Sequence, residues 1–86
     1  MNNYDAQLQT ELLDSFTGFL QSYSKLLDAA EKYEQNVKFA KLIDNSPASI
    51  EMDTYTERLV NLLTNMVPFF VEFSYLEDTL EQLSKR

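Results

Sequence analysis

The sequence predicts an all-α protein, either an antiparallel helical hairpin or a three-helix bundle with a long kinked C-terminal helix, completed by oligomerisation. One glycine and two prolines in 86 residues leave little turn chemistry. β-Branched residues are few and scattered, whereas apolar residues recur every three or four positions in both halves. A chain this short buries a small core, and without cysteine or histidine it has no disulfide or zinc site to reinforce it. We therefore expect one domain over residues 1–86 that is stabilised by a further chain.

A first helical region is predicted over about residues 3–44. Its apolar positions follow steps of four and three: Leu8, Leu12, Phe16, Phe19, Tyr23, Leu27 and Ala30. This spacing is close to the natural period of a straight α-helix. The pattern becomes polar through residues 31–36 and recovers weakly at Val37. The region is therefore predicted as one long helix or as two helices with a break.

A loop is predicted over about residues 45–53. The run Asp44-Asn45-Ser46-Pro47 has the composition of a helix stop, although Ser46 before Pro47 is also typical of the start of a short helical turn. The segment from Thr54 to Glu57 matches a capping box, in which each side chain bonds the backbone amide of the other residue. The second helix is accordingly predicted to begin at residue 54.

The second helix, over about residues 54–84, carries apolar residues in alternating steps of four and three. This seven-residue repeat comprises Tyr55, Leu59, Leu62, Met66, Phe69, Phe73, Leu76, Leu80 and Leu83. Pro68 lies off this seam, and the repeat keeps its phase across it. Proline removes one helical hydrogen bond, so we interpret the position as a kink within one helix.

The segment around Pro68 is apolar on nearly every side. One neighbouring helix covers a stripe of roughly 100°, so part of this surface is predicted to contact a second chain. The predicted interface residues are Leu63, Met66, Val67, Phe69, Phe70 and Phe73. The alternative is that the same residues form the core of a three-helix bundle.

Four acidic residues are candidates for selecting the partner: Glu72, Glu77, Asp78 and Glu81. Glu72 lies at the edge of the seam, where a carboxylate in an interface would pair with a cation of the partner. The other three are a candidate docking patch for a basic protein. The alternative for all four is an ordinary solvated helix face.

The composition argues against several functions. Without histidine, cysteine or a glycine-rich phosphate loop, we expect no enzyme, no cofactor and no metal site. The formal net charge of −7, from 14 acidic and 7 basic residues, argues against a nucleic-acid partner. The most apolar window, residues 59–76, contains Pro68 and Glu72 and is too polar for a transmembrane segment. No basic or continuously apolar run resembles a secretory signal, so a cytoplasmic location is expected.

These observations predict a protein-interaction module, a small helical adaptor or structural subunit that assembles through its second helix. The partner is expected to be a second copy of the chain or another helical protein. In size, lack of cysteine and helix–loop–helix layout, the chain resembles helical bacteriocin immunity proteins, and also small secreted hairpins, although it lacks their Trp-x-Gly turn. An acidic inhibitor or immunity-type protein that neutralises a basic target is the alternative function.

Overall fold

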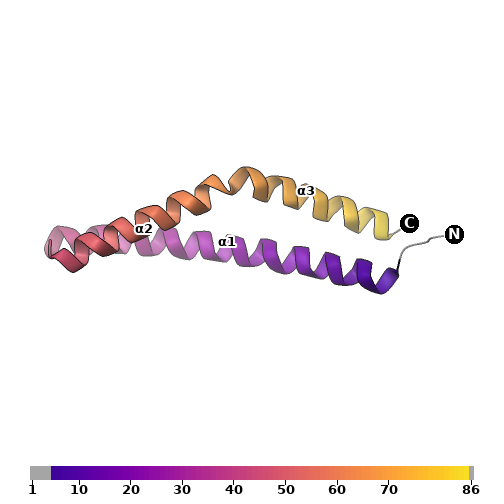
Figure 1. The fold of residues 1–86 in the computed structure, drawn as a ribbon, viewed down its shortest axis with the longest axis horizontal. Coiled ribbons are helices and arrows are strands. Elements are labelled where there is room, and N and C mark those ends of the chain that lie inside the picture. Colours follow the sequence, from indigo (N-terminus) through magenta and orange to yellow (C-terminus); the bar gives the residue numbers. More distant parts are fainter. Residues whose placement is uncertain (1–4, 86) are drawn as a thin grey trace. The chain divides into compact units, whose positions relative to one another are not determined.

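The computed structural model describes residues 5–85. Within this range the chain forms three helices and no strand: α1 (Ala6–Ile43), α2 (Pro47–Asn65) and α3 (Val67–Ser84) (Figure 1). The prediction of an all-α protein is confirmed.

Helix α1 is continuous over 38 residues, so the polar stretch at 31–36 belongs to one long helix. Asp5 caps its start, because one carboxylate oxygen accepts hydrogen bonds from the amides of Gln7 (2.8 Å) and Leu8 (3.2 Å). An ion pair one turn apart, Asp28 with Lys32 at 2.9 Å, lies on the solvent side beside the polar stretch. The predicted start near residue 3 lies outside the described residues.

Helix α2 begins at Pro47, seven residues earlier than predicted, and the connection is only residues 44–46. Ser46 is the N-cap: its hydroxyl accepts a hydrogen bond from the Ser49 amide at 3.2 Å. Pro47 occupies the first helical position, where a missing N–H costs nothing. The loop predicted to extend to residue 53 and the capping box at Thr54 are therefore wrong. Thr54 lies inside α2, and its hydroxyl donates to the Ile50 carbonyl.

The predicted single kinked helix over 54–84 is not confirmed. Helix α2 ends at Asn65, Met66 forms a turn, and α3 begins at Val67. The Met66 amide donates to the Leu63 carbonyl at 3.1 Å, three residues back, which tightens the last turn of α2. Pro68 is the second residue of α3, where the fixed φ of proline suits a helix start.

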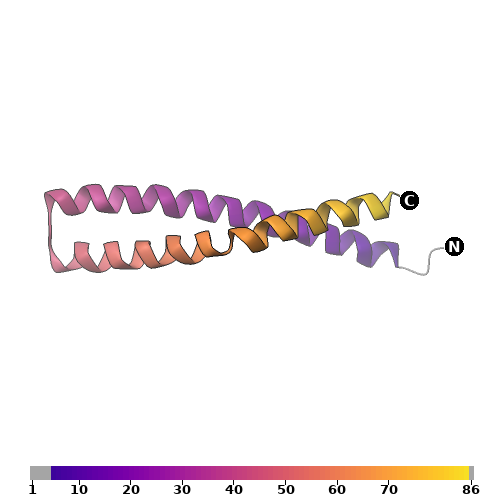
Figure 2. The ribbon, with the colours of Figure 1, turned by 90° about the horizontal axis from the view of Figure 1, so that it is seen from above.

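The chain divides into two compact units. The terminal unit contains residues 1–23 and 68–86, and the central unit contains residues 24–67. In the terminal unit, α3 runs antiparallel beside the first part of α1; in the central unit, α2 runs antiparallel beside the second part (Figures 1 and 2). The expectation of a single domain stays a prediction.

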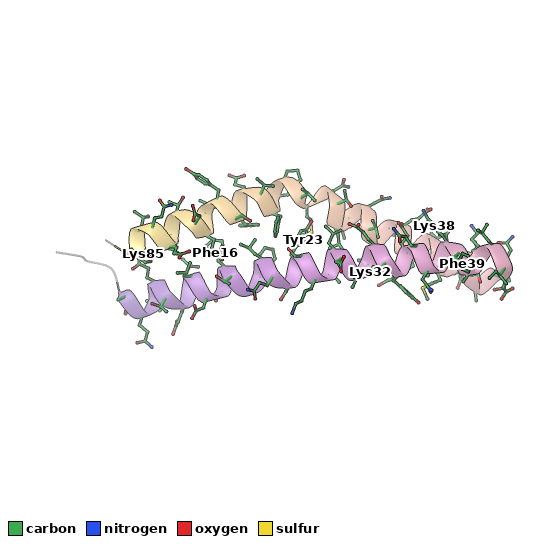
Figure 3. All side chains as sticks on the ribbon, turned by 180° about the vertical axis from the view of Figure 1, so that it is seen from behind. Phe16, Tyr23, Lys32, Lys38, Phe39 and Lys85 are labelled. Atoms are coloured by element: carbon green, nitrogen blue, oxygen red, sulfur yellow. The ribbon has the colours of Figure 1, made fainter. Side chains whose placement is uncertain are left out.

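Each unit has a small core along the line where its two helix segments meet. In the central unit the buried residues are Ala30, Val37, Thr56 and Leu63; in the terminal unit they are Leu20 and Tyr23. Figure 3 shows Phe16 and Tyr23 extending from α1 towards α3. Many large apolar side chains in both units stay exposed.

Candidate interaction surface

In the central unit, the face of α2 that packs on α1 is one residue away from the predicted seam. Thr56 and Leu63 are buried, with 1% and 5% of their surface exposed, whereas the seam residues Tyr55 and Leu62 are 59% and 62% exposed. One residue corresponds to a rotation of about 100° around a helix. The predicted seam is therefore not the inward face of α2.

Polar contacts explain this rotation in the central unit. Asp53, three residues before Thr56 and thus on the same face, bonds the Lys41 ammonium of α1 at 3.0 Å. The Thr56 hydroxyl donates to the Asp53 carbonyl at 3.1 Å. Lys38 and Glu57 form a second, longer ion pair at 3.6 Å. The two ion pairs need Asp53 and Glu57 of α2 to lie near α1, and the seam residues Tyr55 and Leu62 are left outside.

The same one-residue offset occurs in the terminal unit. Phe70 and Glu77 are half-buried on the inner face of α3, while the preceding seam residues Phe69 and Leu76 are exposed. Phe70 stacks on the Tyr23 ring with centroids 4.9 Å apart. The Thr17 hydroxyl donates to the Glu77 carboxylate at 2.6 Å. A stacked ring and a charge-assisted hydrogen bond thus set the rotation of α3.

Phe73 forms an aromatic cluster with α1 at the edge of this packing. Its ring lies edge-on to Phe19, with centroids 5.5 Å apart and planes at 82°, and 6.2 Å from Phe16. The Phe19 ring is in turn 6.5 Å from Tyr23. Phe19 and Phe73 remain 42% and 38% exposed, so one side of the cluster is open to solvent.

A groove of about 280 Å³ lies over this open side. It is lined by Leu12, Ser15, Phe16 and Phe19 of α1 and by Phe73 of α3. The Ser15 hydroxyl is bonded to the Glu11 carbonyl at 2.8 Å, so it already has a partner for its proton. The groove therefore offers an apolar wall, which suits an apolar side chain or the face of a helix.

The predicted interface residues fall into three environments. Val67, Phe69 and Phe73 are exposed, and Phe73 also lines the groove. Met66 and Phe70 are half-buried, and Phe70 is stacked within the terminal unit. Leu63 is buried in the central unit and is not open to a second chain in this structure, so its part in an interface stays a prediction. It faces α1 because the inner face of α2 is rotated by one residue.

Three of the four predicted partner-selecting acids have partners within the chain. Glu77 accepts from Thr17, Asp78 accepts from the Gln82 side chain at 3.2 Å, and Glu81 pairs with Lys85 at 3.3 Å. Glu72 is exposed and has no hydrogen bond or ion pair among the described residues. Of the four acids, Glu72 is therefore the one whose carboxylate is available to pair with a cation of a partner.

The α1 side of the groove was not predicted as an interface. Leu12, Phe16 and Phe19 were interpreted as one apolar face of the first helix. A signal was present, because Leu12 and Phe19 are seven residues apart, like the exposed seam residues of the second half. Exposed apolar residues seven positions apart on both helices indicate that each helix has a face for a further helix.

A larger depression of about 530 Å³ lies in the central unit and is lined by Lys38, Lys41, Leu42, Asn45 and Asp53. Both lysines are already in ion pairs. Among residues 5–85, no group of three or more acidic side chains is placed to hold a metal ion.

Fold and surface together define a class: a small all-helical protein made of antiparallel helix pairs, with an open apolar groove. No protein family, curated protein or solved structure matches the chain. Within the described range no single helix combines the length and apolarity needed to cross a membrane, whereas α2 and α3 taken together meet that criterion by length and composition alone.

Proposed function

We propose that the protein is a non-enzymatic interaction module, a small helical adaptor or structural subunit that binds a helix of another chain in the groove of the terminal unit. The groove carries this proposal, because Leu12, Phe19 and Phe73 form a continuous apolar wall while remaining about half exposed. An amphipathic helix laid into such a groove buries its own apolar face and completes the core. The partner is a second copy of the chain or another helical protein.

The exposed seam supports the same proposal. Phe69, Leu76 and Leu83 lie seven residues apart on α3 and are all exposed, and Phe73 lies between them at the groove. A repeat of this kind is the pattern by which helices pack along one another. The seam is therefore available to a further helix.

The alternative function, an acidic inhibitor of a basic target, draws on the same unit. Its support is weaker, because Glu77, Asp78 and Glu81 are engaged within the chain. Assembly through the apolar groove should persist in high salt, whereas a complex held by carboxylates should weaken as salt screens the charges. The cytoplasmic location and the lack of enzymatic activity also stay predictions.

A matched pair of leucine variants tests the proposal. Leu12→Glu introduces a charge into the groove at a half-exposed position, and Leu42→Glu makes the same change at an exposed position of α1 in the central unit. Both variants should keep their helical circular dichroism. Sedimentation of the protein alone measures self-association, and titration with synthetic amphipathic helices measures binding of other chains.

Leu12→Glu should abolish whichever association the parent shows, and Leu42→Glu should leave it unchanged. A parent protein that sediments as a monomer and binds none of the amphipathic helices would refute the proposal. Equal loss of association in the two variants would place the interface elsewhere.

A further inference from the structure

Charge is distributed very unevenly between the two units. The described part of the terminal unit contains seven acidic residues: Asp5, Glu11, Asp14, Glu72, Glu77, Asp78 and Glu81. Its one basic residue in that range is Lys85, which is paired with Glu81. In the central unit, five basic residues balance most of its acids. A chain approaching the groove therefore meets a strongly negative surface.

Two of these carboxylates are close in the helices to residues that line the groove, since Glu11 precedes Leu12 and Glu72 precedes Phe73. Glu11 lies one helical turn before Ser15, which lines the groove on the α1 side. Glu72 lies on the surface of α3 between Phe69 and Leu76, three residues after one and four before the other. Both carboxylates are exposed and have no hydrogen bond or ion pair among residues 5–85.

The two carboxylates lie at different levels along the groove. The stacking of Phe70 on Tyr23 places Glu72 near the level of residue 21 of α1, about ten residues beyond Glu11. At 1.5 Å per residue this is roughly 15 Å, or between two and three helical turns. Because Glu11 lies on α1 and Glu72 on α3, the two carboxylates lie on different helices and at different levels along the groove.

We propose that the groove binds a basic amphipathic helix of another protein, with apolar residues against Leu12, Phe19 and Phe73 and cations on both flanks. The cations would meet Glu11 on one flank and Glu72 on the other, between two and three turns apart. This inference rests on the proposed function and names the chemistry of the partner. Apolar contact provides the surface area buried on binding, and the two carboxylates favour a partner helix that has basic residues on its flanks.

A second copy of the chain fits this surface poorly. Its terminal unit brings the same seven acids and the same paired lysine to the contact. Like charges brought together at an interface oppose association. The charge of the groove's border therefore favours a basic partner over self-assembly.

The test uses three synthetic helices of 18 residues, the length of α3, with the same leucine face. Their flank positions carry lysine, glutamine or glutamate, and a scrambled lysine peptide has the same composition without the apolar face. Binding to the full chain is measured by fluorescence anisotropy at low and high salt. The lysine helix should bind about three- to tenfold more tightly than the glutamine helix, and the difference should shrink in high salt.

Matched double variants locate the effect. Glu11→Gln with Glu72→Gln should remove most of the preference for the lysine helix. Glu31→Gln with Glu51→Gln changes the net charge equally at exposed positions of the central unit and should keep that preference. Circular dichroism checks that both proteins remain helical.

Several results would overturn the inference, and they separate it from the proposed function. Equal binding of the three leucine-faced helices shows a groove without charge preference, and the proposed function stands. A dimeric parent that Leu12→Glu converts to a monomer, and that binds no peptide, shows a second copy in the groove. Tight binding of the scrambled lysine peptide, or an equal effect of both double variants, shows general attraction to an acidic protein. A monomer that binds none of the peptides overturns both.

Discussion

The two units pack different kinds of residue against the same helix. In the terminal unit, the contact between α1 and α3 is made by aromatic rings, with Tyr23 and Phe70 at its centre and Phe73 at its edge. In the central unit, the contact between α1 and α2 contains the Lys41–Asp53 pair and the buried Thr56. Aromatic packing contributes area and stability, whereas polar contacts contribute little net stability and specify one register.

The one-residue offset of the inner faces of α2 and α3 leaves much apolar surface exposed. In each unit the inner face of α2 or α3 is one residue beyond the seven-residue seam, because a polar or stacking contact is made there. The seam residues Leu62 and Phe69 are consequently left outside, each 62% exposed. The terminal unit combines this exposure with an apolar groove, so we propose the binding site there.

The largest effect is expected from removing the aromatic centre of the terminal unit. Tyr23→Ala should lower the free energy of unfolding by about 3 kcal/mol, because Tyr23 is buried and stacks on Phe70. Tyr75→Ala, at an exposed position of α3, should change it by less than about 0.5 kcal/mol. Urea unfolding measures both.

Amide exchange on the Tyr23→Ala variant shows which unit Tyr23 stabilises. Exchange should speed up in α3 more than in α2, because Tyr23 belongs to the terminal unit. Equal acceleration in α2 and α3 would show that the two units open together.

The next effect concerns the polar contact of the central unit. Lys41→Met should cost about 1–3 kcal/mol, because it leaves Asp53 largely buried without its cation, and the other Asp53 oxygen is already buried without a hydrogen bond. Adding Asp53→Leu should restore most of this loss, since apolar residues often replace a buried ion pair at no cost. Lys32→Met, which breaks an exposed pair, is the control and should cost less than about 0.5 kcal/mol.

The double variant should regain stability but lose the single register in which α2 packs on α1. Disulfide trapping between cysteines introduced on α1 and α2 should give one product in the parent protein and several in Lys41→Met/Asp53→Leu. A double variant that stays as unstable as Lys41→Met alone would show that the pair contributes through packing.

A smaller effect is expected at the hydrogen bond from Thr17 to Glu77. Thr17→Val keeps the shape of the side chain and removes the donor, which should cost about 1 kcal/mol at this half-buried position. Thr10→Val is the matched control, because the Thr10 hydroxyl donates only to a carbonyl of its own helix, on the exposed side. Unchanged stability in Thr17→Val would show that the aromatic rings alone set the rotation of α3.

Periodicity was sufficient to predict that the chain is helical, but not the bounds of the second and third helices or the rotation of each helix. The steps of three and four in α1 and the seven-residue repeat in the second half define helices whichever face is buried. The inner face depends on contacts between residues far apart in the sequence, such as Thr17 with Glu77 and Lys41 with Asp53. For the candidate site, the exposed aromatics of α3 were predicted, whereas the wall from α1 was not.

The start of α2 was missed because the sequence contains two possible helix starts. The sequence offers two helix starts, at Ser46 with Pro47 and at Thr54 with Glu57, and both satisfy known capping patterns. In the structure α2 takes the earlier start, residues 47–53 join the helix, and Asp53 lies 3.0 Å from Lys41. Local sequence does not show which start gains such a contact.

The smallest change in stability, but a clear change in binding, is expected at Pro68. Because Pro68 lies in the first turn of α3, Pro68→Ala should change the free energy of unfolding by no more than about 1 kcal/mol. The alanine regains an N–H that can bond the Thr64 carbonyl, which stabilises the helix. This gain is offset because the unfolded chain becomes more flexible without the proline. Alanine also favours continuing α2 through Met66, which would shift α3, and with it Phe73, relative to Phe16 and Phe19 of α1 and disturb the groove. We therefore expect binding of an amphipathic helix to weaken severalfold.

Pro47→Ala, at the first turn of α2, is the control for the loss of a proline and should leave binding unchanged. If Pro68→Ala binds as tightly as the parent, the break between α2 and α3 has no part in recognition; if it unfolds far more easily, proline is needed for packing within the terminal unit.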